Sequence, residues 1–243
     1  MRRPHDLRNA ELFATAPQAA ESDCAGVLVT HAGGETVELH AQRALHWPRG
    51  RTLFVADVHL GKGATFRAAG VPVPRGATAA DLARLSGLVA RTGATTLCVL
   101  GDFLHAATGR VAALDRAVQA WRESHRDLDV LLVRGNHDLH AGDPPASWHV
   151  CVVPEPHALP PFLACHAPHA PRRGHALCGH VHPGVTVRGR AHEAVRLPCF
   201  VLGPRCTLLP AFGRLTGLAG VVPAAGETVV AIAGSRLFRL PTG

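Results

Sequence analysis

The sequence predicts a layered α/β fold in which two β-sheets meet. Three observations support this prediction. In the first half, strand-like and helical segments alternate as βαβα, whereas from His149 onward helices are scarce and short strands follow one another closely. In addition, 47% of the 243 residues are hydrophobic, which is enough to bury a real core as one large domain or two small ones.

The first half begins with strands that lead into a helix. Strands are predicted over Val27–Thr30, Thr36–His40 and Thr52–Ala56. A helix is predicted over Thr78–Arg91, because its leucines recur at helical spacing and fall on one face. We expect Thr78 to cap this helix and Gly93 to end it. The unbroken apolar run at Thr95–Leu100 predicts a fully buried strand.

A second helix is predicted from about Arg110 to His125, followed by a strand over Asp129–Arg134. Short strands are then expected at Val150–Val153, Phe162–Cys165, Ala176–Cys178, Val185–Val187, Cys199–Leu202 and Thr207–Leu209. The chain ends in a predicted hairpin, in which Val229–Ala233 and Arg236–Leu240 are joined by a two-residue turn that a glycine begins.

No internal repeat or strong linker interrupts the chain, so we expect residues 25–243 to form a single domain after an N-terminal arm at residues 1–24. Seven cysteines without a C-x-x-C pair favour reduced thiols over a disulfide framework or a zinc cluster, which indicates the cytoplasm. The N-terminus lacks the apolar core of a signal peptide, and no apolar run is long enough to span a bilayer. We therefore expect a soluble protein with no membrane partner.

The chain carries a formal charge of +7, almost all of it from arginine, with 24 Arg against one Lys. The planar guanidinium group suits phosphate oxygens, so this excess fits an anionic partner such as nucleic acid. A solvated basic surface explains the charge equally well. Tyrosine is absent, and no aromatic platform for stacking single-stranded bases is visible.

Five short segments place metal-type ligands directly after apolar runs. They are Asp57-Val58-His59, Gly101-Asp102, Gly135-Asn136-His137-Asp138, Cys165-His166 and Gly179-His180-Val181-His182. Each segment follows a predicted strand, and ligands of open α/β sheets bind beyond the carboxyl ends of the strands. We therefore expect side chains from distant parts of the sequence to meet at one place.

Together these segments supply enough donors for two divalent cations and one catalytic side chain. The donors are imidazole nitrogens and carboxylate or amide oxygens without sulfur, a set that favours manganese, iron or zinc. We expect two manganese ions, with iron or zinc as alternatives. Two cations held side by side are a known arrangement for hydrolysing phosphate esters.

In this order, the five segments resemble the calcineurin-like metallophosphoesterase superfamily over roughly residues 50–190. The resemblance implies a layered αββα sandwich of two mixed β-sheets flanked by helices. It implies a first ion held by Asp57, His59, Asp102 and His182. It implies a second ion held by Asp102, Asn136, His166 and His180, with Asp102 shared. His137 would then meet the phosphate or the leaving group, and Asp138 would orient its neighbours.

A narrower likeness covers nearly the whole chain. The segments HWPRGRTLFVADVHLGK, FRAAGVPVPRG, GDFLH, CGHVHPGVTVRG and LPCFVLGPRCTLLPAFGRLTG resemble the ligase-associated DNA damage response endonuclease subfamily, the PdeM type. This likeness implies a DNA substrate. It also implies an association with an ATP-dependent DNA ligase, a helicase and an exonuclease-like protein.

Three further residues are candidates for substrate contact or for support of the ligands. Where many superfamily members carry Asp or Asn after the Gly-Asp pair, this chain has His105, which we interpret as a supporting or substrate-facing group. Lys62, the only lysine, follows His59 closely and is a candidate for a phosphate contact at the rim of the site. Arg67 is a candidate for contact with a nucleic-acid backbone, although a solvated arginine is the simpler interpretation.

The leading hypothesis is a two-metal phosphodiesterase that acts on DNA in repair. In this chemistry water attacks phosphorus in line, and His137 protonates or stabilises the departing oxygen. Two alternatives use the same residues. One is a phosphatase or phosphodiesterase for a small phosphorylated metabolite, and the other is a weakly active, metal-stabilised scaffold in a repair complex.

Overall fold

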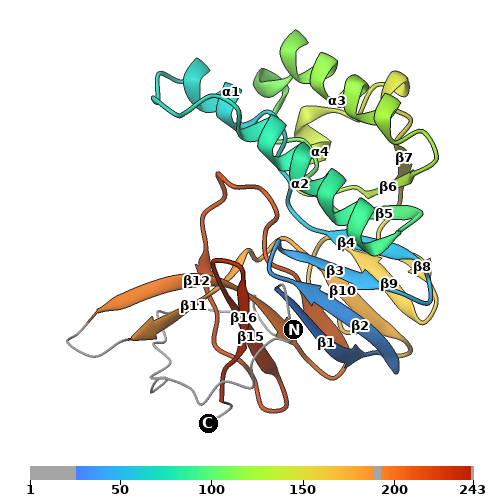
Figure 1. The fold of residues 1–243 in the computed structure, drawn as a ribbon, viewed down its shortest axis with the longest axis vertical. Helices are drawn as coiled ribbons and strands as arrows, with labels where there is room; N and C mark the ends of the chain where they lie inside the picture. Colours follow the sequence, from blue (N-terminus) through green and yellow to red (C-terminus); the bar gives the residue numbers. More distant parts are fainter. Residues whose placement is uncertain (1–25, 189–192, 242–243) are drawn as a thin grey trace, which may run out of the picture.

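A computed structural model describes residues 26–188 and 193–241, so the N-terminal arm predicted at residues 1–24 lies outside the described residues. One sheet contains the first seven strands side by side in sequence order (Figure 1). They are β1 (Val27–Ala32), β2 (Glu35–His40), β3 (Ala44–Trp47), β4 (Thr52–Val55), β5 (Thr96–Leu100), β6 (Asp129–Val133) and β7 (Cys151–Val153). Strands β1 to β4 pair antiparallel and β4 to β7 pair parallel, so the sheet is mixed.

The second sheet is built from the rest of the chain. Its strands are β8 (His157–Leu159), β9 (Phe162–Cys165), β10 (His175–Cys178), β11 (Pro183–Arg188), β12 (Ala194–Leu202), β13 (Cys206–Leu208), β14 (Ala219–Gly220), β15 (Thr228–Ala233) and β16 (Arg236–Arg239). They lie in the order β14-β11-β12-β13-β10-β9-β8, and β12 also pairs with β15 of the β15–β16 hairpin. Parallel and antiparallel pairs both occur, so this sheet is also mixed, as predicted.

All described α-helices fall between β4 and β7, and Figure 1 shows them over the first sheet. They are α1 (Lys62–Ala68), α2 (Ala77–Thr92), α3 (Ala112–Ser124) and α4 (Asn136–Ala141), with short 3-10 turns at Ala107–Gly109 and Ala146–Trp148. The predicted sandwich of two mixed sheets with flanking helices is confirmed. Within the described ranges, none of the helices has the length and apolar character that crossing a bilayer requires.

The predicted N-cap residue of α2 is wrong. Thr78 does not cap the helix; Gly76 does, in a left-handed conformation with φ 93°. Thr78 already lies inside the first turn, because glycine allows the chain to bend into the helix two residues earlier. Gly93 ends the helix with φ 64°, as expected.

Two apolar layers hold the molecule together. One lies between the first sheet and α2 and α3, and the other lies between the two sheets. Phe162 of β9 is completely buried in the layer between the sheets. Its ring contacts Trp47 and Phe54 of the first sheet edge to face, with centroids 5.1 and 6.1 Å apart. The two sheets are therefore fixed relative to each other by aromatic packing close to the strand that precedes His166.

The described cysteines are all free, as predicted: Cys98, Cys151, Cys165, Cys178, Cys199 and Cys206. Burial raises the pKa of Cys98 to about 12 and that of Cys199 to about 12. Both side chains are thus neutral thiols that act as small core residues.

Replacing Phe162 tests the packing between the sheets. We expect Phe162→Ala to lower the free energy of unfolding by about 3–5 kcal/mol, because the large cavity left behind cannot collapse fully. Urea denaturation measures this change. The control Val29→Ala alters a side chain that is 60% exposed on β1 and should cost about 0.5 kcal/mol or less. Equal losses in the two variants would contradict this account of the core.

Candidate metal centre

The metal-type residues lie where strands of both sheets end. Asp57 and His59 follow β4, Asp102 follows β5, and Asn136 follows β6 and begins α4. From the second sheet, His166 follows β9, and His180 and His182 follow β10. Strands β4, β5 and β6 run parallel, as do β9 and β10, so their carboxyl ends converge on one edge. The predicted ligands of both sheets do meet there.

A first group contains Asp57, His59, Asp102 and His182, whose ligand atoms all lie within 4.8 Å of one another. The Nε2 atoms of His59 and His182 are 3.5 Å apart, and His182 Nε2 is 3.5 Å from Asp57 Oδ1. Burial, followed by the nearby charge of Lys62, lowers the pKa of His59 to about 2. The His59 imidazole is therefore neutral at physiological pH, the form that binds a metal.

A second group contains Asp102, His166 and His180, again within 4.8 Å. His166 Nε2 lies 3.0 Å from His180 Nδ1 and 2.9 Å from the amide oxygen of Asn136. Burial also lowers the pKa of His180, with a further contribution from His166. The group thus offers two imidazoles, one carboxylate and one amide oxygen, the ligand set implied for the second ion.

Asp102 connects the two groups through its two carboxylate oxygens. Its Oδ2 is 3.9 Å from His59 Nε2 in the first group, and its Oδ1 is 3.6 Å from His166 Nε2 in the second. Burial raises the pKa of Asp102, while His166 opposes the shift and Asp57 adds to it. Two carboxylates buried side by side are unfavourable without positive charge between them. Divalent ions would supply that charge, so the donor set fits a metal pair.

Backbone carbonyls determine which nitrogen of two key histidines is free. His166 Nδ1 is 3.1 Å from the carbonyl oxygen of Leu100, and His137 Nδ1 is 2.7 Å from that of His105. A neutral ring that donates from Nδ1 has an unprotonated Nε2. In His166 this nitrogen is available to a metal, and in His137 it faces a substrate. The sequence does not reveal these acceptors, since every residue supplies a carbonyl.

Glycines within the motifs make room for the ligands. A Cβ at Gly101 would collide with the ring of His166, and one at Gly135 would collide with the Asp102 carboxylate. A Cβ at Gly179 would lie 2.9 Å from Asp57 Oδ2. Close approach therefore requires the glycines that precede Asp102, Asn136 and His180.

The ligands themselves adopt an unusual backbone conformation. Positive φ angles occur at Asp57 (53°), His59 (51°), Asp102 (50°), His180 (67°) and His182 (51°). Non-glycine residues avoid this region, and each such residue costs about 1–3 kcal/mol. Local strain concentrated at the donors indicates that the surrounding sheets hold them in place for a purpose other than stability.

His137 lies beside the two groups, and its ligand atom is within 4.8 Å of those of His59 and His105. Its side chain is 38% exposed, and its Nε2 is 4.0 Å from Asp102 Oδ2. The ring stacks on His105, with centroids 4.9 Å apart, and its backbone N–H donates to Asp102 Oδ1 at 2.8 Å. His137 is thus the side chain of the centre that is anchored on one face and open to a substrate on the other.

His105 contacts the ligand His59, and Asp138 holds the backbone of two ligand-bearing loops. His105 Nδ1 is 3.4 Å from His59 Nδ1, and burial, followed by the Lys62 charge, lowers its pKa to about 4. Asp138 is fully buried and accepts the backbone N–H groups of Gly135 and Leu104, each at 2.9 Å. Asp138 therefore joins the loops that follow β5 and β6.

The two predicted cationic residues differ in position. Lys62 begins α1 and is half-buried; burial lowers its pKa, while Asp102 and Asp57 oppose that shift. Its positive charge thus lies near both carboxylates. Arg67 is exposed near the other end of α1 and donates to the Pro74 carbonyl at 3.5 Å. The structure does not place Arg67 within the donor groups.

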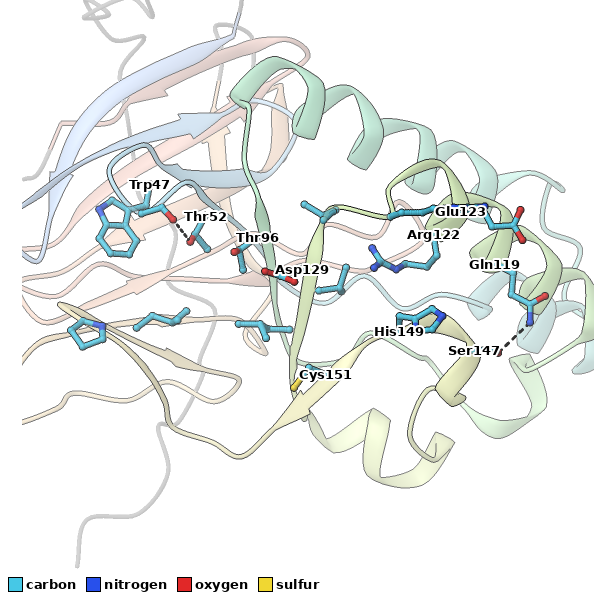
Figure 2. A pocket seen from close by; sticks show the side chains of 17 residues that line it. Trp47, Thr52, Thr96, Gln119, Arg122, Glu123, Asp129, Ser147, His149 and Cys151 are labelled. Carbon is cyan, nitrogen blue, oxygen red and sulfur yellow. Dashed lines mark hydrogen bonds between the residues drawn. The ribbon is translucent and has the colours of Figure 1, made fainter.

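A large cavity of about 1120 Å³ lies away from the metal-type residues (Figure 2). Its walls include Thr52, Thr96 and Asp129, which begin β4, β5 and β6, together with Arg122 and His149. It is therefore at the amino ends of the parallel strands, opposite the edge where the donors converge. The cavity is not part of the candidate centre.

The role of Gly101 can be tested by a single methyl group. We expect Gly101→Ala to weaken binding of the ion in the second group by roughly 10–100-fold, because the added Cβ displaces His166. Isothermal titration of the metal-free protein with manganese measures this change. The matched control is Gly87→Ala, which adds a methyl group in open space within α2 and should leave affinity unchanged. Wild-type affinity in Gly101→Ala as well as in Gly87→Ala would contradict the requirement for glycine at position 101.

Comparisons with known proteins agree with this geometry. No family model matches the chain, and no curated protein matches it significantly. Among solved structures, the nuclease MPE of Pseudomonas putida is 41% identical, with 88% of this chain and 100% of that chain covered and a TM-score of 0.76. The phosphoesterase YfcE of E. coli is 18% identical, covers 75% of this chain and 88% of its own, and has a TM-score of 0.36, too low to bear on the argument. Given the extensive match to the Pseudomonas nuclease and the donor arrangement described above, this chain belongs to the metallophosphoesterase family and is a metal-dependent phosphoesterase.

Proposed function

We propose that this phosphoesterase is a manganese-dependent nuclease that hydrolyses DNA phosphodiester bonds in ligase-associated repair in the cytoplasm. The observation that carries the proposal is the position of Asp102. Its two oxygens face two separate groups of ligands, and the half-exposed His137 lies beside them. Such an arrangement is suited to a phosphate held between two cations.

Different residues of the centre have different roles in the proposed reaction. When bound, two divalent ions act as Lewis acids on phosphoryl oxygens and lower the pKa of a coordinated water. His137 donates from Nδ1 to the His105 carbonyl, which orients its Nε2 toward the departing oxygen; the imidazolium form of the ring would donate its Nε2 proton to that oxygen. Lys62 adds a positive charge near both carboxylates, where it attracts the phosphate.

Several features favour DNA over a small phosphorylated molecule. The Pseudomonas relative is a nuclease. The net charge of +7 comes from arginines, which suit the phosphates of a nucleic-acid backbone. Arg172 and Arg173 are exposed in the loop that begins at His166 and leads into β10. This loop starts at His166, so we expect its arginines to contact the DNA backbone near the bond that is cleaved.

The proposed partners follow from the subfamily resemblance of the sequence. They are an ATP-dependent DNA ligase, a helicase and an exonuclease-like protein. A nuclease that removes damaged ends is useful beside a ligase, because the ligase needs intact ends to join. Co-purification of the tagged chain with these proteins would test the association separately from catalysis.

Replacing His137 tests its catalytic role. We expect His137→Ala to reduce hydrolysis of an aryl phosphodiester by about 10²–10⁴-fold, the contribution typical of a positioned proton donor. Metal content and the circular dichroism spectrum should not change. The control His31→Ala alters an exposed histidine of β1 and should leave the rate unaffected. A fully active His137→Ala enzyme would exclude the proposed role.

Removal of the ions tests the metal requirement and separates the three functions. Chelation should abolish hydrolysis, and manganese should restore it, whereas Asp102→Asn should not recover, since it weakens both groups of ligands. Supercoiled plasmid, an aryl phosphodiester and an aryl phosphomonoester are compared under the same conditions. Nicking of the plasmid supports the nuclease. Turnover of the small esters alone would favour a metabolite enzyme, and no turnover with any metal would favour a scaffold.

A further inference from the structure

A separate cluster of metal-type side chains lies on the hairpin of β2 and β3, away from the strand ends that carry the catalytic groups. It consists of Glu38, His40 and His46. Their neighbours Leu39 and Leu45 pack between the two sheets. Because side chains alternate along a strand, the cluster projects from the opposite face of the sheet, the face that α2 and α3 cover.

Strand pairing brings the three side chains together. Glu38 and His46 are direct partners across the antiparallel pair, and His40 lies two residues beyond Glu38 on the same face. Glu38 Oε2 is 2.9 Å from His46 Nδ1 and 3.6 Å from His40 Nε2. All three ligand atoms lie within 4.8 Å of one another.

Both histidines are buried with ring nitrogens that have no partner. His40 is 1% exposed and His46 is 5% exposed. Within the described part of the chain, Nδ1 and Nε2 of His40 and Nε2 of His46 form no hydrogen bond. Buried polar atoms without a partner are rare in native proteins and require an explanation.

We propose that Glu38, His40 and His46 form a third metal site, which binds zinc and is separate from the catalytic pair. Two imidazoles and one carboxylate are a known zinc ligand set that leaves a position for water. Tetrahedral ligands about 2.0–2.1 Å from zinc lie roughly 3.4 Å from one another. The two separations from Glu38 fall on either side of this value.

The surroundings of the site admit an ion. The Glu38 side chain is 32% exposed, so an ion and its water can enter beside it. The adverse group is Arg91 of α2, whose charge lowers the pKa of His40. Its guanidinium donates to Gln42 at 3.0 Å, and the Glu38 carboxylate opposes its effect. Bound zinc would join β2 to β3 and stabilise the native hairpin.

The test measures zinc stoichiometry in the full-length protein. Metal-free protein is loaded with zinc chloride, desalted and analysed by atomic emission. We expect Glu38→Gln and His40→Leu each to hold one zinc ion fewer per chain than the wild type. Loss of a direct ligand should weaken affinity by more than the roughly 10–100-fold typical of supporting residues. The matched control His31→Leu, on the neighbouring strand β1, should retain the wild-type number.

The two variants also keep the inference distinct from the proposed catalysis. Hydrolysis of the aryl phosphodiester with manganese should be unchanged in Glu38→Gln, and zinc should raise its unfolding temperature less than that of the wild type. Wild-type zinc content in both Glu38→Gln and His40→Leu would overturn the proposal. If His40→Leu does not fold, Glu38→Gln decides alone, since it keeps the shape of the side chain. The zinc counts do not depend on the nuclease assay, so a protein without nuclease activity would contradict the proposed function and leave this proposal unaffected.

Discussion

The repulsion between two buried carboxylates is the constraint on which the candidate centre depends. Asp57 and Asp102 are both buried, and burial raises the pKa of Asp102. A folded chain keeps such a pair charged only when positive charge is nearby. Lys62 supplies part of it, and two divalent ions between the oxygens would supply the rest. The motif glycines and the converging strand ends serve this one requirement.

Packing between the two sheets holds the strained ligand residues in position. The aromatic contacts of Phe162 fix the second sheet against the first, immediately before the strand end that carries His166. The ligands with positive φ therefore lie directly after well-packed strands of both sheets. The same rigidity holds His137 against His105, with one ring nitrogen already engaged. Stability in the core and reactivity at the edge are thus two results of one architecture.

The metal-type residues were predictable because each follows an apolar strand, and parallel strands end at a common edge. Other features depend on information that local sequence lacks. Helix α1 is short and contains Gly63, so it has no clear helical pattern. Strand β3, Ala-Leu-His-Trp, is buried on both faces and shows no alternation of polar residues. The cluster around Glu38 could not be foreseen, because it requires the register that places His46 opposite Glu38.

The strand order of the two sheets has a consequence for biosynthesis. Neighbours in the first sheet are consecutive in the chain, so that sheet can form while the ribosome is still adding residues. The second sheet contains crossovers, and it delivers His166, His180 and His182 only after most of the polypeptide has emerged. A nascent chain that ends before β10 therefore carries half-built coordination spheres. The complete set of ligands therefore exists only once strands of both sheets are in place.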